Sequence, residues 1–237
     1  MTEADWWVAT GPEGLIDWLF FDALAADRKL RLFSVAACQP LRRLVGDPGI
    51  LADLDLAEAF ADGQVDAAAL ATARAAGWTR LHTRQPNSQA LPREVGMAEL
   101  VCFSPLFGEN APRDRESYPG EEDIPYARSV AQGMNHQSRR ETVLPRLVPL
   151  LHDIFGPLPF REVAILPEWL TSDVTALARG IYDEKAFDRM PILADALQDA
   201  GCDNDEVLTH CQRENWEYTR GCWVIDLLLG RPWRERA

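Results

Sequence analysis

Residues 188–201, with the sequence DRMPILADALQDAG, have the features of a short amphipathic helix. Asp188 can cap the N-terminus, Pro191 suits the first turn, and Gly201 can end the helix. Apolar residues recur at helical spacing, so we predict that they face the core: Ile192, Leu193, Ala196 and Leu197. Caps, apolar stripes and terminal glycines of this kind repeat along most of the chain, which indicates an all-α fold.

The same signals predict further helices on both sides of this stretch. Thr2 and Asp5 have the spacing of a capping box, which favours a helix at the start of the chain. The expected helices cover residues 3–9, 12–25, 28–45, 50–61, 67–76, 138–155, 172–182, 204–213 and 221–229. Gly77 is expected to end the fifth of them, and Ser172 to cap the seventh. We therefore predict a multi-helix globular array of about nine to eleven helices, with residues 158–166 as the one strand candidate.

Residues 79–137 differ from the rest of the chain because they hold six prolines and four glycines. We interpret them as a loop-rich insertion with short helices near 94–102 and 126–135, and expect 104–123 to be its most mobile part. The predicted organisation is a single helical domain, 1–237. Within it, residues 1–78 supply N-terminal helices and 138–237 supply C-terminal helices.

Composition excludes several classes of protein. Of the 237 residues, 47% are hydrophobic and 26% are charged, which argues against disorder over the whole chain. With 37 acidic and 24 basic residues, the formal net charge of −13 disfavours nucleic-acid binding. Five cysteines do not suggest a disulfide scaffold, and neither a signal peptide nor a membrane span is evident. These features predict a cytoplasmic protein with reduced thiols.

Several stretches are similar to an uncharacterised family of paralogous helical proteins from planctomycetes. They are MTEADW (1–6), DRKLRLF (27–33), LLHDIFG (150–156), AFDRMPILADAL (186–197), AGCD (200–203) and RGCWVIDLLLG (220–230). The resemblance covers both ends of the chain, and it implies a shared helical fold without implying an activity. The chain departs from the family pattern at 33–39, where only Cys38 stands in place of a cysteine-rich stretch. It departs again at 214–219, where a Gly-Pro-rich link with a histidine is expected.

No common catalytic motif is present: the chain lacks a Gly-Lys-Ser/Thr loop, a Gly-x-Ser-x-Gly elbow and a His-Glu-x-x-His helix. The residues that could still form an active site are His136, His152, Asp153 and Asp226. Their convergence in one pocket would favour an enzyme, and their separation would argue against one.

Asp226 stands in the middle of an otherwise apolar stretch, so we expect its carboxylate to be buried and paired with an arginine. The candidate partners are Arg179, Arg189 and Arg220. We interpret Asp226 as a structural rather than a catalytic residue.

Cys202, His210, Cys211 and Cys222 are residues of the types that bind zinc. Their spacing contains no Cys-x-x-Cys knuckle, and the neighbours His210 and Cys211 point in different directions on a helix. Cysteines also pack in cores as small apolar residues. We therefore predict no bound zinc and no cofactor.

Two features suggest contacts with other proteins. Trp6, Trp7 and Trp18 belong to an aromatic group that either packs as core or forms an interface. Residues 173–206 carry nine acids and three bases, which is either a solvated face or a docking face for a basic partner. The predicted function is a non-catalytic protein-interaction or adaptor role, with another protein or a second copy as partner. The alternative is an enzyme or metal-binding protein with a site between the 79–137 insertion and the C-terminal helices.

Overall fold

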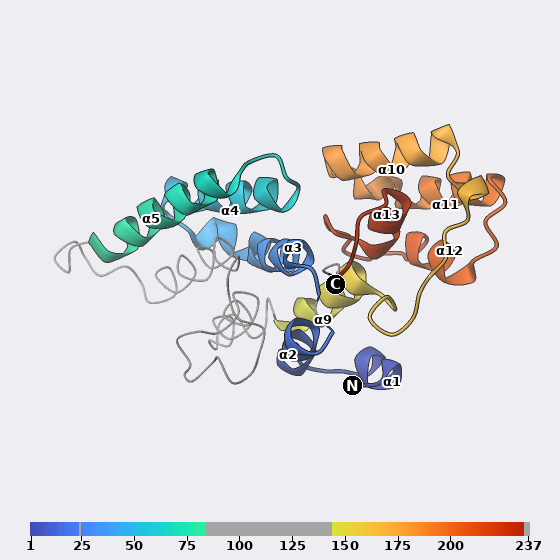
Figure 1. Ribbon diagram of the computed structural model, residues 1–237, viewed down its shortest axis with the longest axis horizontal. Coiled ribbons are helices and arrows are strands. Elements are labelled where there is room, and N and C mark those ends of the chain that lie inside the picture. Colours follow the sequence, from blue (N-terminus) through green and yellow to red (C-terminus); the bar gives the residue numbers. More distant parts are fainter. Residues whose placement is uncertain (24, 84–143, 235–237) are drawn as a thin grey trace.

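A computed structural model describes residues 1–23, 25–83 and 144–234, and these ranges contain ten α-helices and no strand (Figure 1). Five of these helices lie within residues 1–83: α1 (Glu3–Trp7), α2 (Glu13–Phe21), α3 (Asp27–Cys38), α4 (Pro48–Ala61) and α5 (Ala67–Thr83). The other five lie within residues 144–234: α9 (Leu144–Phe155), α10 (Ser172–Glu184), α11 (Met190–Asp199), α12 (Asp205–Cys211) and α13 (Trp223–Leu228). The all-α prediction is confirmed for these residues.

Most of the predicted insertion lies outside the described residues, including 94–102, 104–123 and 126–135. The strand prediction for 158–166 is wrong, since this segment consists of turns and irregular chain. A strand needs a second extended segment to pair with its backbone groups. Within the described residues, the one β-type pairing is an isolated bridge between Ala25 and Arg234.

Some of the predicted helix ends are confirmed and others are wrong. Asp188 does not cap α11, because the 3-10 turn Phe187–Arg189 precedes this helix and makes Arg189 its N-cap, without a side-chain hydrogen bond. The Thr2 hydroxyl accepts from the Asp5 amide, and the Asp5 carboxylate accepts from the Thr2 amide, so the capping box is confirmed. Thr171, rather than Ser172, caps α10. Helix α5 continues through the buried Gly77 to Thr83, so the prediction that Gly77 ends this helix is wrong. A helix tolerates an interior glycine at a modest cost in stability.

The described helices build two large hydrophobic cores that meet at the middle of the molecule, and a small third cluster of Val35, Ala57 and Leu70 joins α3, α4 and α5. In Figure 1, α3 and α9 lie at the centre, α4 and α5 extend to one side, and α10–α13 lie on the other. One core is formed by α1–α4 and α9, and the other by α10–α13 with the segment that precedes them. Trp233 packs against both cores.

A close contact between Gly156 and Trp223 sets the end of α9 against the start of α13. Gly156 has a φ of 51°, in the left-handed region that favours glycine. A Cβ atom at this position would lie 2.6 Å from the indole ring of Trp223. The contact therefore fixes where Asp153, near the end of α9, stands relative to Cys222, which precedes α13.

Candidate functional site

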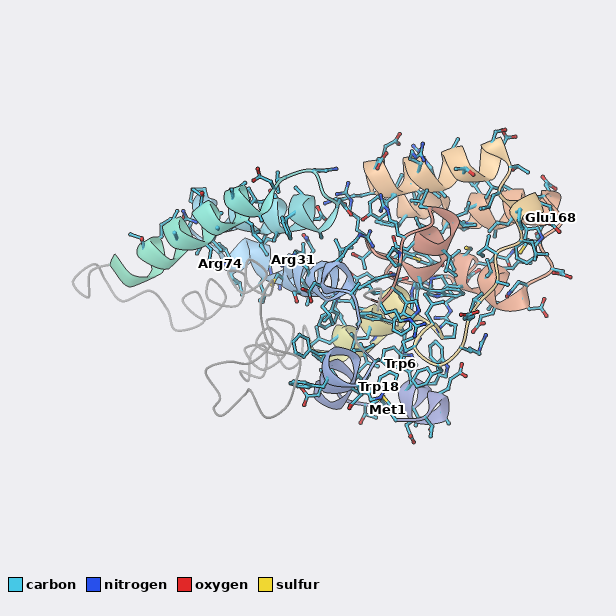
Figure 2. All side chains as sticks on the ribbon, in the orientation of Figure 1. Met1, Trp6, Trp18, Arg31, Arg74 and Glu168 are labelled. Atoms are coloured by element: carbon cyan, nitrogen blue, oxygen red, sulfur yellow. The ribbon has the colours of Figure 1, made fainter. Side chains whose placement is uncertain are left out.

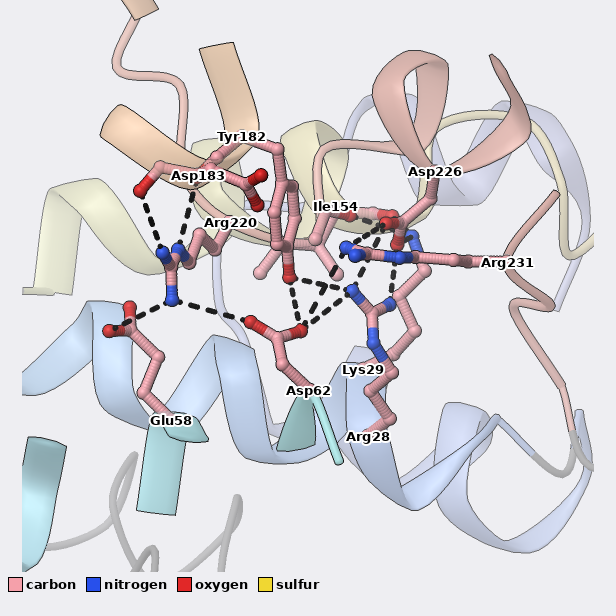
Figure 3. A network of polar contacts seen from close by, with 11 residues as sticks. Arg28, Lys29, Glu58, Asp62, Ile154, Tyr182, Asp183, Arg220, Asp226 and Arg231 are labelled. Carbon is pink, nitrogen blue, oxygen red and sulfur yellow. Dashed lines mark hydrogen bonds and ion pairs between the residues drawn. The ribbon is translucent and has the colours of Figure 1, made fainter. Parts of the chain in front are cut away.

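A network of charged and polar side chains lies where the two cores meet (Figure 3). It draws residues from α3, the end of α4, α10, α13 and both flanks of α13. We call it the junction network; its members are Arg28, Lys29, Glu58, Asp62, Tyr182, Arg220, Asp226 and Arg231.

Lys29 is the most deeply buried cation of the junction network, with none of its side chain exposed. Its ammonium donates to the carbonyl oxygens of Ile154 at 2.7 Å and Gly221 at 2.6 Å. It also lies 2.8 Å from Oδ2 of Asp226. An ammonium has three N–H donors, so these three acceptors satisfy all of them without water.

Asp226 is 1% exposed and accepts two hydrogen bonds from the Arg28 guanidinium, at 2.7 and 3.1 Å. Burial alone would raise the pKa of Asp226, but the charges of Lys29 and Arg28 outweigh it and hold the pKa below its ordinary value. The expected burial and arginine pairing are confirmed.

The partners expected for Asp226 are wrong. Arg220 pairs with Glu58 and Asp62, Arg189 pairs with Glu184, and Arg179 is exposed. Packing of α13 against the start of α3 brings Arg28 and Lys29 to the carboxylate instead.

Tyr182 links two charged members of the junction network. Its hydroxyl donates to Asp62 and accepts from Arg28 at 2.7 Å. The Arg231 guanidinium lies 3.9 Å from the centre of the Tyr182 ring, and that of Arg220 lies 5.1 Å from it. Burial raises the pKa of Tyr182 well above its ordinary value, so the hydroxyl stays a neutral donor. The arrangement holds the two cores together.

A second cluster, which we call the Asp–His–Cys cluster, joins α9, α12 and the start of α13. Its members are Asp153, His210 and Cys222, with exposed fractions of 0, 2 and 0%. Nε2 of His210 lies 3.2 Å from Sγ of Cys222 and 3.3 Å from Oδ1 of Asp153. The Asp153 carboxylate also accepts from the Trp216 indole at 3.1 Å and the Thr219 amide at 2.9 Å. Three potential ligand atoms thus face one another in the interior.

The Asp–His–Cys cluster does not have the geometry of a nucleophilic triad. In such a triad the carboxylate binds one imidazole nitrogen and the nucleophile binds the other. Here Asp153 and Cys222 both approach Nε2 of His210. Burial raises the pKa of the Cys222 thiol well above its ordinary value, and the Asp153 charge raises it further, so the thiolate nucleophile is disfavoured.

The four residues considered for zinc separate into two groups. His210 and Cys222 come together, whereas Cys202 and Cys211 are not members of the cluster. Asp153, which the sequence suggests only as a catalytic candidate, joins them from α9. Sequence spacing could not identify it, because its approach depends on how α9 packs against α12 and α13.

The four catalytic candidates do not form one described pocket. His152 lies against Trp6 and Trp7, with Nε2 3.1 Å from the Trp6 carbonyl oxygen, and burial lowers its pKa. Asp153 belongs to the Asp–His–Cys cluster, and Asp226 to the junction network. His136 lies outside the described residues.

The aromatic group is mainly core. Trp6 is fully buried beside Trp18, and Trp18 stacks on Phe160 with ring centres 4.8 Å apart (Figure 2). Trp6 therefore cannot serve as the interface residue that we considered. Trp7 is 36% exposed and the neighbouring Val8 is 74% exposed, whereas Trp18 is half-buried.

The acids of 173–206 lie on the surface of α10–α12. Eight are exposed and one is half-buried: Asp173, Asp183, Glu184, Asp188, Asp195, Asp199, Asp203 and Asp205, with Glu206 as the half-buried one. Glu184 and Glu206 are the two that form ion pairs with described residues. We call this surface the acidic face.

Ile192 also lies on the acidic face. It is 56% exposed, so the prediction that it faces the core is wrong. The buried side of α11 is formed by Met190, Leu193, Ala194 and Leu197. A helix at the surface buries one stripe of side chains, and Ile192 lies outside that stripe.

Comparison of the chain with protein-family models, with curated proteins and with solved structures gives no match. Within the described residues, none of the helices has the length and apolar character needed to cross a membrane.

Proposed function

We propose that the chain is a non-catalytic protein-interaction or adaptor protein that binds a basic protein partner through its acidic face. The observation that carries this proposal is the exposure of the acids on α10–α12, most of which form no ion pair with a described residue. Such a surface attracts a positively charged partner and speeds its association.

Ile192 gives the acidic face an apolar anchor. Counted by the helical period, Ile192, Asp195 and Asp199 lie on one side of α11, and all three are exposed. An apolar contact surrounded by carboxylates is complementary to a helix or extended segment that carries leucines among lysines and arginines. The apolar contact supplies affinity, and the carboxylates select the charge of the partner.

The alternative of an enzyme is less well supported by the geometry. His152, Asp153 and Asp226 lie in three separate environments, each of them buried. A substrate needs a concave site with convergent polar groups, and these residues do not provide one together.

The proposal includes a cytoplasmic location and the absence of nucleic-acid partners. The support for the location is that Cys38, Cys202, Cys211 and Cys222 are all free thiols, as expected in a reducing compartment. The net charge of −13 supports the second point.

The test is calorimetric titration of the full chain with a basic amphipathic peptide of alternating leucines and lysines. We expect binding that weakens as salt rises, because the attraction is electrostatic. The variant Asp195→Asn/Asp199→Asn should bind about ten-fold more weakly, and Ile192→Ser should also weaken binding.

Glu162→Gln/Glu168→Gln is the matched control, since it removes two exposed charges that lie outside α10–α12. If this control and the Asp195/Asp199 variant lose the same affinity, then only the net charge of the protein attracts the peptide. The proposal that the acidic face is the binding surface would then be wrong.

A further inference from the structure

We propose that Asp153, His210 and Cys222 bind a zinc ion that fastens α9, α12 and α13 together. This inference is independent of the proposed protein-interaction function, and it reverses the prediction of no zinc made from spacing. Sequence spacing indicates a metal site only where the ligands stand close together in the chain, whereas here each ligand comes from a different segment.

The distances within the Asp–His–Cys cluster suit a tetrahedral ion. Zinc binds carboxylate oxygen, imidazole nitrogen and thiolate sulfur at about 2.0–2.3 Å, which places neighbouring ligand atoms about 3.3–3.6 Å apart. The two distances from Nε2 of His210 are 3.2 Å to sulfur and 3.3 Å to oxygen. All three ligand atoms lie within 4.8 Å of one another, so the Asp153 oxygen and the Cys222 sulfur need to approach each other by at most about 1.2 Å to reach tetrahedral spacing.

Hydrogen bonding alone accounts poorly for this arrangement. Nε2 of an imidazole offers one proton or one lone pair, yet it faces both Asp153 and Cys222 at nearly equal distances. A cation at the point where the three atoms converge would be bound by all of them at once.

The charge balance of the cluster also favours a cation. Asp153 is completely buried, and within the described residues His210 is the one side chain at ion-pair distance from it. The other partners of the carboxylate, the Trp216 indole and the Thr219 amide, are neutral donors. A buried carboxylate needs compensating positive charge, which a divalent ion provides.

The groups around the cluster resemble the supporting shell of a metal site. The hydrogen bonds from Trp216 and Thr219 fix the orientation of the Asp153 carboxylate. Cys211, which follows His210 in the chain, is also buried, although its sulfur does not belong to the cluster.

Complete burial indicates a structural rather than a catalytic zinc. Catalytic zinc keeps a position open to water and substrate, whereas structural zinc is enclosed by four ligands, so one ligand beyond these three residues completes the proposed site. When zinc binds, the Cys222 thiol gives its proton to solvent and its sulfur forms the metal bond. The ion would tie the end of α9, which belongs to one core, to two helices of the other.

The test starts with the wild-type full chain, freed of metal with a chelator and then titrated with Zn²⁺ and Co²⁺. We expect about one Zn²⁺ per chain by elemental analysis and a higher melting temperature that a chelator reverses. Co²⁺ should give a thiolate-to-metal charge-transfer band in the near-ultraviolet. A wild-type chain without this band, and with no zinc retained after gel filtration, overturns the proposal.

Variants then assign the ligands. Cys222→Ser should abolish the charge-transfer band, and Asp153→Asn, which keeps the shape of the side chain, should weaken metal binding about 10–100-fold. Cys202→Ser is the matched control, because it removes a buried thiol outside the cluster and should keep the band. If Cys222→Ser does not fold, the metal affinities of the wild-type chain and of Asp153→Asn still test the proposed site. Wild-type metal affinity in Asp153→Asn would show that the site lies elsewhere.

Discussion

The ammonium of Lys29 lies 2.8 Å from the carboxylate of Asp226, although Lys29 belongs to the third helix of the chain and Asp226 to the last. Neither side chain is more than 1% exposed. Arg28 binds the same carboxylate through two hydrogen bonds. Arg231 lies 3.7 Å from it as well, so three cations converge on one buried anion. Arg28 also pairs with Asp62, whereas Lys29 forms its ion pair with Asp226, so removal of that anion affects Lys29 most.

Replacement of Asp226 is expected to destabilise the fold. Asp226→Ala leaves the buried Lys29 ammonium without its charged partner, which typically costs about 3–5 kcal/mol in free energy of unfolding. Asp226→Asn keeps the shape but not the charge, and should lose a smaller part of the same free energy. Urea unfolding at neutral pH measures both. Asp195→Ala, an exposed aspartate on α11, is the control and should change little. Wild-type stability of both Asp226 variants would mean that the carboxylate has no structural role.

The contribution of Asp226 should vanish in acid. The pKa of Asp226 is held below its ordinary value, so the folded state binds this proton less tightly than the unfolded chain does. The stabilisation is thus fully present above the unfolded pKa of about 3.9, and is lost as the pH falls through the folded value. We expect the stability difference between wild type and Asp226→Asn to shrink between about pH 5 and pH 2. A constant difference over that range would contradict the pairing.

The sequence could predict the helices because their signals are local. Caps such as Thr2 with Asp5, and the apolar stripe of residues 190–197, act within one or two turns of the chain. The burial of Asp226 also followed from its apolar neighbours. Ile192 was assigned to the core because the period alone does not show how wide the buried stripe of a helix is.

The partners within each site could not be predicted, because they depend on packing between distant helices. Asp226 meets Arg28 only because the fold brings α13 close to the start of α3. Asp153 meets His210 and Cys222 only because the end of α9 packs against the start of α13. The spacing of residues along the chain predicts neither contact. The sequence therefore suggests Asp153 only as a catalytic candidate, and His210 and Cys222 only as metal candidates.

Gly156 should be the most sensitive glycine of the described chain. Alanine there would adopt a left-handed φ of 51° and place its Cβ 2.6 Å from the Trp223 ring. The backbone penalty of about 1–2 kcal/mol adds to an overpacking cost of about 1–3 kcal/mol, so Gly156→Ala should lower the free energy of unfolding by several kcal/mol. Gly180→Ala is the matched control, since Gly180 lies inside α10 with nothing within 4 Å of the added Cβ. That variant should gain up to about 1 kcal/mol from helix propensity. Chemical denaturation of both variants gives the comparison, and equal stability of the two would show that the contact between Gly156 and Trp223 does not position α13.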